Sequence, residues 1–115
     1  MMRPSPELQT LKAQFFRALA HPLRIRILEL LAGGGELTVR QLQEALVVGQ
    51  PIVSQQLARL RASGVVDVRK VGTSASYVLA DPLVGELLKV SKQIMNRRLV
   101  GAQTLLRELR DEPTR

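Results

Sequence analysis

The spacing of apolar residues changes twice along the chain, and this change constrains the fold more than any other feature. Up to Gly64 the apolar residues recur every three to four positions, as they do in amphipathic helices. From Val66 to Leu79 apolar and polar residues alternate, which is typical of half-buried strands. After Pro82 the helical spacing returns. The chain is therefore expected to be mainly α with one small β-hairpin.

Proline and glycine residues mark the ends of the first two expected helices. The first is expected over residues 5–19, because Ser5 can cap a helix and Pro6 suits its first position. Its apolar residues form one stripe: they are Leu8, Leu11, Phe15 and Leu19. A second helix is expected over residues 23–32, after Pro22 and before a run of glycines.

Residues 38–64 contain two further helices separated by a short turn. Thr38 can cap the first of them, and residues 47–49 form the expected turn. The second begins at Gln50-Pro51, with a proline again near its first position. Its apolar residues lie on one face: they are Val53, Leu57 and Leu60. Two helices joined by so short a turn form a helix-turn-helix.

A hairpin and one long helix complete the expected fold. The hairpin covers residues 65–79, with a glycine-containing loop at residues 71–75 between its strands. The long helix covers residues 82–110 and has an apolar face along its length. We expect this face to be buried, together with the first helix, against a second copy of the chain. The whole chain, residues 1–115, is expected to form a single domain.

The composition narrows the possible functions. The chain has 115 residues, which is the length of one domain, and 17 Lys and Arg against 10 Asp and Glu give a net charge of +7. This excess favours a polyanionic partner. Since there is no cysteine, disulfides and thiolate metal sites are excluded. No apolar run is long enough to span a membrane and the first residues lack a secretion signal, so a cytoplasmic protein is expected.

The chain lacks the residues that an enzyme would need. It contains one histidine, His21, and no GxSxG motif, which leaves little material for nucleophilic catalysis. The run of three glycines has neither the lysine nor the preceding strand of a phosphate-binding loop. His21 stands before a helix-opening proline, where it is expected to be a cap or packing residue, the alternative being a metal ligand or proton switch. We therefore expect no enzymatic activity, no cofactor and no metal site.

The second helix of the helix-turn-helix carries the residues best suited to reading DNA bases. Given its inner stripe, Gln55 and Arg59 point away from the core, and the amino-terminal half of such a helix enters the major groove. Glutamine can bond adenine and arginine can bond guanine. The predicted DNA contacts on this helix are Gln50, Ile52, Ser54, Gln55 and Arg59. The alternative is that these side chains form an ordinary solvated helix face.

The hairpin carries the second set of predicted DNA contacts. One strand has two adjacent cations, and hydroxyl side chains follow across the tip. Such groups suit contacts with phosphate or with the minor groove, which add affinity but little sequence information. The predicted contacts are Arg69, Lys70, Thr73 and Ser74. The alternative is a charged edge strand that prevents aggregation.

Three stretches of the chain resemble the ArsR/SmtB winged-helix regulators. Residues 16–28, FRALAHPLRIRIL, are similar to the family's opening ALADPTRLRIL, and residues 36–42, ELTVRQL, are similar to ELCVCDL. Residues 50–66, QPIVSQQLARLRASGVV, resemble SQPTVSRHLKVLREAGLV and match it most closely. The resemblance covers residues 8–110. It implies a winged helix-turn-helix fold and a homodimeric transcriptional repressor, with the first and last helices forming the dimer contact.

The departures from the family pattern concern metal sensing. Where metal-sensing members have two cysteines, this chain has Thr38 and Arg40, neither of which can replace a thiolate. The last expected helix has no histidine. We therefore expect a transcriptional repressor that binds double-stranded DNA at a pseudo-palindromic operator. Its effector is expected not to be a metal, and the sequence does not identify it. The alternatives are a winged-helix module for protein–protein interaction and a non-specific architectural DNA-binding protein; a membrane-surface role for residues 82–110 is disfavoured, because that helix has no Trp or Phe.

Overall fold

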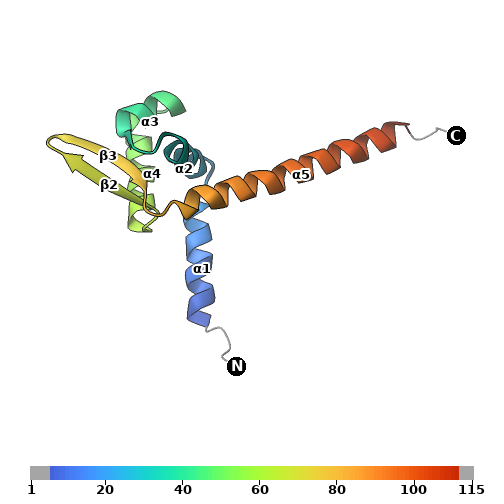
Figure 1. The fold of residues 1–115 in the computed structure, drawn as a ribbon, viewed down its shortest axis with the longest axis horizontal. Helices are drawn as coiled ribbons and strands as arrows, with labels where there is room; N and C mark the ends of the chain where they lie inside the picture. Colours follow the sequence, from blue (N-terminus) through green and yellow to red (C-terminus); the bar gives the residue numbers. More distant parts are fainter. Residues whose placement is uncertain (1–5, 112–115) are drawn as a thin grey trace. The chain divides into compact units, whose positions relative to one another are not determined.

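A computed structural model describes residues 6–111, which form two compact units that divide between Gly85 and Glu86. Five helices and three strands follow one another along these residues (Figure 1). In chain order they are α1 (Pro6–Leu19), α2 (Pro22–Gly34), β1 (Leu37–Thr38), α3 (Val39–Leu46), α4 (Gln50–Ala62), β2 (Val66–Val71), β3 (Ser74–Leu79) and α5 (Leu83–Asp111). The expected mainly α fold with a small β element is confirmed. Ser5, the predicted cap of the first helix, lies outside the described residues.

The core of the first unit lies where α2, α3 and α4 meet the sheet. Its fully buried side chains include the predicted apolar face of α4: they are Ile27, Leu28, Leu31, Leu42, Val53, Leu57, Leu60 and Val66. In α1 only Leu19 is buried within the single chain, while Leu8 and Leu11 are exposed. Helix α1 packs against α4 near its C-terminal end, and the rest of its apolar stripe is the surface expected to meet a second copy. Within the described residues no helix is long and apolar enough to span a bilayer.

Side-chain caps fix the starts of α2 and α3. The backbone N–H of Leu23 donates to Nδ1 of His21 at 3.1 Å, so the predicted capping role of His21 is confirmed. Thr38 caps α3: its hydroxyl accepts from the N–H of Gln41 at 3.1 Å, and Oε1 of Gln41 accepts from the N–H of Thr38 at 2.8 Å. This reciprocal pair is a capping box, which satisfies two backbone donors that a helix start would leave free.

The end of α2 lies beyond the predicted position. The helix continues through Gly34, and only Gly35 takes the positive φ, +80°, that allows the chain to turn away. A β-carbon on Gly34 would approach the side chain of Leu37 to 3.1 Å. The glycine at position 34 therefore permits the close contact with the segment that follows the helix.

The sheet has one more strand than the sequence indicated. Its order is β1-β3-β2, and all pairs are antiparallel. β1 consists of two residues, with Leu37 opposite Tyr77, and so short a strand shows no alternation in the sequence. The predicted five-residue loop at 71–75 was also too long, because Val71 pairs with Ser74. Gly72 and Thr73 alone join the strands, and Gly72 has a φ of +61°.

The turn between α3 and α4 contains a strained residue. The predicted turn at 47–49 is confirmed, and its first residue, Val47, has φ 55° and ψ 45°. This left-handed conformation is unfavourable for a branched side chain. Its N–H donates to the carbonyl of Gln43 at 2.9 Å and closes α3. The tight turn brings α4 directly after α3, as a helix-turn-helix requires.

Candidate nucleic-acid interface

Helix α4 buries one face and leaves the other exposed. Val53, Leu57 and Leu60 anchor it against the core, and it packs against α2, α3 and β2. Gln55, Ile52 and Arg59 are exposed, as the sequence indicated, and Ser54 is half-buried. Nε2 of the exposed Gln50 donates to Oγ of Ser54 at 3.3 Å, which orients the first turn of the polar face.

Arg59 lies one turn beyond Gln55 on nearly the same face of α4. Counting 100° per residue, Gln55 points nearly opposite the buried stripe, and Arg59 is turned by about 40° from it toward the flank that carries Gln56 and Ser63. Arg59 there lines an open pocket together with Arg17 of α1. The five predicted contacts of α4 therefore share one helix, and Arg59 is the one that also lines a pocket with α1.

A hydrogen bond between the buried Gln56 and the half-buried Arg24 fixes this flank of α4. Gln56 is 7% exposed, and its Oε1 accepts from Nη1 of Arg24 at 3.0 Å. Arg24 also donates from Nε to the carbonyl of Ala18 at 2.8 Å and from Nη2 to that of Arg17 at 3.4 Å. Because these carbonyls belong to the last turn of α1, a single guanidinium joins α1, α2 and α4. Sequence reasoning did not identify this pair, although the spacing of Gln56 from Val53 and Leu60 places it beside the buried stripe.

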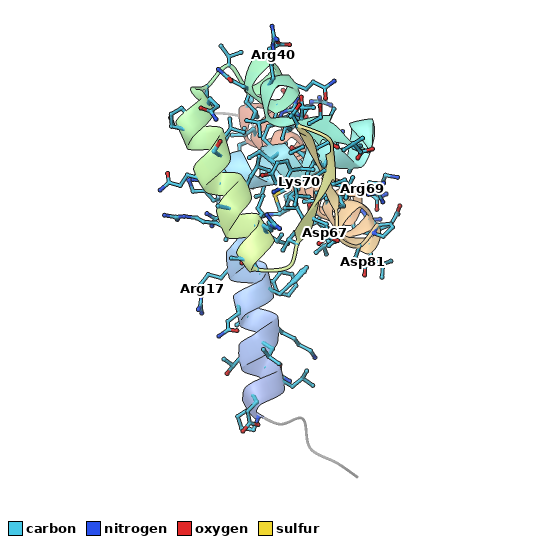
Figure 2. The ribbon with its side chains drawn as sticks, turned by 90° about the vertical axis from the view of Figure 1, so that its left-hand side faces the viewer. Arg17, Arg40, Asp67, Arg69, Lys70 and Asp81 are labelled. Atoms are coloured by element: carbon cyan, nitrogen blue, oxygen red, sulfur yellow. The ribbon has the colours of Figure 1, made fainter. Side chains whose placement is uncertain are left out.

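The hairpin presents its charged side chains next to α4. β2 packs against α4, and the hairpin extends beyond the contact (Figure 1). Figure 2 shows Arg69 and Lys70 on the hairpin, with α4 beside it. Both cations are exposed, and so are Thr73 and Ser74 at the tip. As neighbours on one strand, Arg69 and Lys70 point to opposite faces of the sheet.

An exposed hydrogen bond joins β3 of the hairpin to the segment between α2 and β1. Oγ of Ser76 donates to Oε1 of Glu36 at 2.7 Å, and Ser76 is the strand partner of both Thr38 and Arg69. The hydroxyl of Ser76 is therefore already hydrogen-bonded within the chain. The free hydroxyls of the tip come from Thr73 and Ser74 instead.

The cations of α4 and the hairpin have no acidic partner among the described residues. Ion pairs in this part of the chain join Arg26 to Glu29, Arg40 to Glu44 and Lys89 to Glu86, each within one helix. Arg59, Arg61, Arg69 and Lys70 are in none of them. Exposed positive charge without internal compensation is suited to a polyanion such as nucleic acid.

The side chains at the family's metal-sensing positions do not fit a soft metal ion. The hydroxyl of Thr38 is occupied by its helix cap, and Nε of Arg40 bonds Oε1 of Glu44 at 3.3 Å. Neither group supplies a thiolate. No three His, Asp or Glu side chains between residues 6 and 111 lie close enough together to hold a metal ion.

Comparison with known proteins gives concordant matches. A family model described as "Bacterial regulatory protein, arsR family" matches residues 21–68. The chain is 41% identical over 106 residues to Rv0081, an HTH-type transcriptional regulator of Mycobacterium tuberculosis, which covers 92% of the chain and 93% of the relative. It is 43% identical over 77 residues to a transcriptional repressor SmtB homolog of Synechocystis, which covers 67% of the chain and 58% of the relative.

Solved structures support the same assignment. The crystal structure of Mycobacterium tuberculosis Rv0081 superposes with a TM-score of 0.76 and covers 86% of this chain and 98% of that one. The homodimeric winged helix-turn-helix DNA-binding domain of Mycobacterium bovis Mb0332, a solution structure, is 29% identical with a TM-score of 0.74 and covers 86% of this chain and 94% of that one. These similarities confirm the winged helix-turn-helix fold, in which the β2–β3 hairpin is the wing.

Proposed function

Because the chain belongs to the arsR family of bacterial regulatory proteins, we propose that it is a homodimeric repressor that binds a pseudo-palindromic DNA operator. Its relatives are transcriptional regulators, which confirms a regulatory and not an enzymatic role. The proposal is carried by one observation: α4 exposes a polar face next to a wing whose cations have no acidic partner among the described residues.

The exposed apolar side chains of α1 and α5 support the dimer. These two helices carry most of the large apolar residues that are exposed in the single chain. They include Leu8, Leu11, Phe16, Val90, Ile94, Leu99, Leu105, Leu106 and Leu109. So much exposed apolar surface marks an interaction site in a protein that must stay in water. A second copy supplies a matching surface, and the Mycobacterium bovis relative is described as homodimeric.

In this dimer the two copies of α4 enter successive major grooves. The half-sites of a winged helix-turn-helix dimer lie about one helical turn, roughly 34 Å, apart. Gln55 is exposed opposite the buried face of α4 and is the side chain best placed to bond a base edge. Gln50, Ile52, Ser54 and Arg59 complete the contacts of this helix.

The wing contributes affinity without strong sequence preference. Arg69 and Lys70 reach phosphates that flank the half-site, and Thr73 and Ser74 donate from the tip. Cations that neutralise phosphates make binding depend on salt, because each contact releases condensed counterions. The wing therefore contributes affinity for DNA of any sequence, and α4 contributes base recognition.

Selection of bound duplexes from a random library tests the proposal. We expect the selected sequences to share a motif with two-fold symmetry, whose half-sites are centred about ten base pairs apart. Unrelated sequences bound with equal affinity would instead indicate an architectural DNA-binding protein, and weak, fully salt-sensitive binding would indicate a protein-interaction module. Either result would overturn the proposal.

Substitution of Gln55 tests which face of α4 reads the sequence. Gln55→Ala should weaken binding to the selected operator by about 1–3 kcal/mol and relax the preference at one base pair of each half-site. Gln103→Ala on α5 removes the same exposed side chain far along the chain from α4 and should leave the base preference unchanged. Fluorescence anisotropy on the operator and on single-base variants measures both. An unchanged preference in Gln55→Ala would disprove the assigned reading face.

A further inference from the structure

An open pocket lies between α1 and α4 in the first unit. Its volume is about 380 Å³, within the range of sites for small molecules. Its polar lining residues are Gln14, Arg17, Arg24, Arg59 and Ser63, and two alanines complete it. Figure 2 shows Arg17 projecting from α1 near the C-terminal end of α4. This pocket is separate from the wing and from the metal-sensing positions of the family.

The pocket concentrates positive charge. Three guanidinium groups line it, from α1, α2 and α4, and its lining contains no carboxylate. Within the described residues none of these three arginines takes part in an ion pair. Three like charges around one pocket repel one another, and an anion between them would relieve that repulsion. Guanidinium groups are the cations best matched to carboxylate and phosphate oxygens.

Arg24 is held in place before any ligand arrives. Its three hydrogen bonds to the carbonyls of Ala18 and Arg17 and to Oε1 of Gln56 use three of its five N–H groups. Two N–H groups are left for a ligand. The same bonds cap the last carbonyls of α1, which would otherwise oppose an anion. Arg17 and Arg59 are exposed, and no described hydrogen bond holds their guanidinium groups, so both are available to close on a bound molecule.

We propose that this pocket binds a small molecule with two or more phosphate or carboxylate charges and that its binding weakens DNA binding. The pocket has room for more than a single phosphate group, and its three cations call for more than one negative charge. The regulatory half rests on the proposed function, in which Arg59 contacts DNA. An arginine engaged by the ligand is withdrawn from the operator, so the ligand and DNA compete for the same side chain.

The binding half is tested without DNA. Isothermal titration with inorganic pyrophosphate, at ionic strength held constant with sodium chloride, should show saturable binding. Arg17→Gln should weaken this binding at least tenfold. Arg61→Gln on α4 also removes one exposed positive charge, but Arg61 does not line the pocket. The affinity of this variant for pyrophosphate should therefore stay within twofold of that of the original protein. Absence of saturable binding, or equal weakening in both variants, would show only general attraction and would overturn the site.

The regulatory half is tested on the selected operator by fluorescence anisotropy. Operator affinity in saturating pyrophosphate should be at least fivefold lower than in sodium chloride of equal ionic strength. The substitution Arg17→Gln should make this difference smaller. If pyrophosphate binds but operator affinity does not change, the coupling is wrong and the site stands. If Arg17→Gln weakens operator binding and pyrophosphate does not bind, a DNA phosphate occupies the pocket and the proposal fails. A chain that binds no operator refutes the proposed function, while the titration still decides the site.

Discussion

Replacing Val47, in the turn between α3 and α4, with glycine should make the protein more stable. Its φ of 55° and ψ of 45° place a β-branched side chain in the left-handed region. The side chain is 87% exposed, so almost no apolar burial depends on it. The N–H of residue 47 donates to the carbonyl of Gln43, and glycine keeps that hydrogen bond. The substitution Val47→Gly therefore removes strain without removing contacts.

The expected magnitude follows from two opposing terms. The left-handed conformation costs an L-residue about 1–2 kcal/mol, and β-branching places Val47 toward the upper end. Glycine increases the freedom of the unfolded chain, which lowers the stability by about 0.4–1 kcal/mol. The difference predicts that Val47→Gly raises the free energy of unfolding by about 0.5–1.5 kcal/mol.

Urea denaturation followed by circular dichroism measures this change. All variants are compared at one protein concentration, because association contributes to apparent stability. Val71→Gly is the matched control: Val71 is 80% exposed but lies in β2 with a negative φ. There the same replacement should lower the stability by up to about 1 kcal/mol, since a strand favours valine over glycine. If Val47→Gly is no more stable than the original, or shifts in the same direction as the control, the strain argument is wrong.

Three further substitutions test the core, the α3 cap and the wing. Thr38→Val keeps the side-chain shape but removes the hydroxyl that caps α3, and urea denaturation should show a loss of about 1 kcal/mol; an unchanged midpoint would mean that the capping box contributes nothing. Leu57→Ala empties a fully buried position and should cost about 2–5 kcal/mol in the same assay; a loss below 1 kcal/mol would contradict its place in the core. Lys70→Ala should weaken binding to all DNA sequences alike and reduce the slope of log affinity against log salt by about one; a change confined to the operator would instead make Lys70 a base-reading residue.

The elements that the sequence predicted are those long enough for the spacing of their apolar residues to be recognised. Helices α2, α3 and α4 repeat apolar residues over two or more turns, and each contributes fully buried side chains to the core. β1 has two residues and shows no period, so only its pairing with β3 identifies it. The last two residues of α2, Gly33 and Gly34, were missed for a different reason. Glycine has poor helix propensity, so the run of glycines predicts an earlier end of the helix than the structure has.

The candidate site was predictable to the level of the helix face. Exposure of Gln55, Arg69 and Lys70 follows from their spacing relative to apolar neighbours, and the structure agrees. The partnership of Arg24 with Gln56 depends on a separation of 32 residues, which no local pattern records. The stripe of α1 is exposed in the single chain, and its predicted burial against a second copy stays a prediction. Contacts with DNA themselves stay predictions.

Thr38 belongs to two elements at once, since it pairs with Ser76 in the sheet and its hydroxyl caps α3. Thr38, the last residue of β1, thus connects the hairpin directly to the start of the helix-turn-helix. A tilt of the sheet carries the start of α3 with it, and α4 follows through a turn of three residues, 47–49. We therefore expect the wing and α4 to keep a fixed distance from each other. DNA in which the phosphates that meet the wing and the major groove that receives α4 are spaced differently should bind weakly, and a longer wing should not restore the contacts of α4.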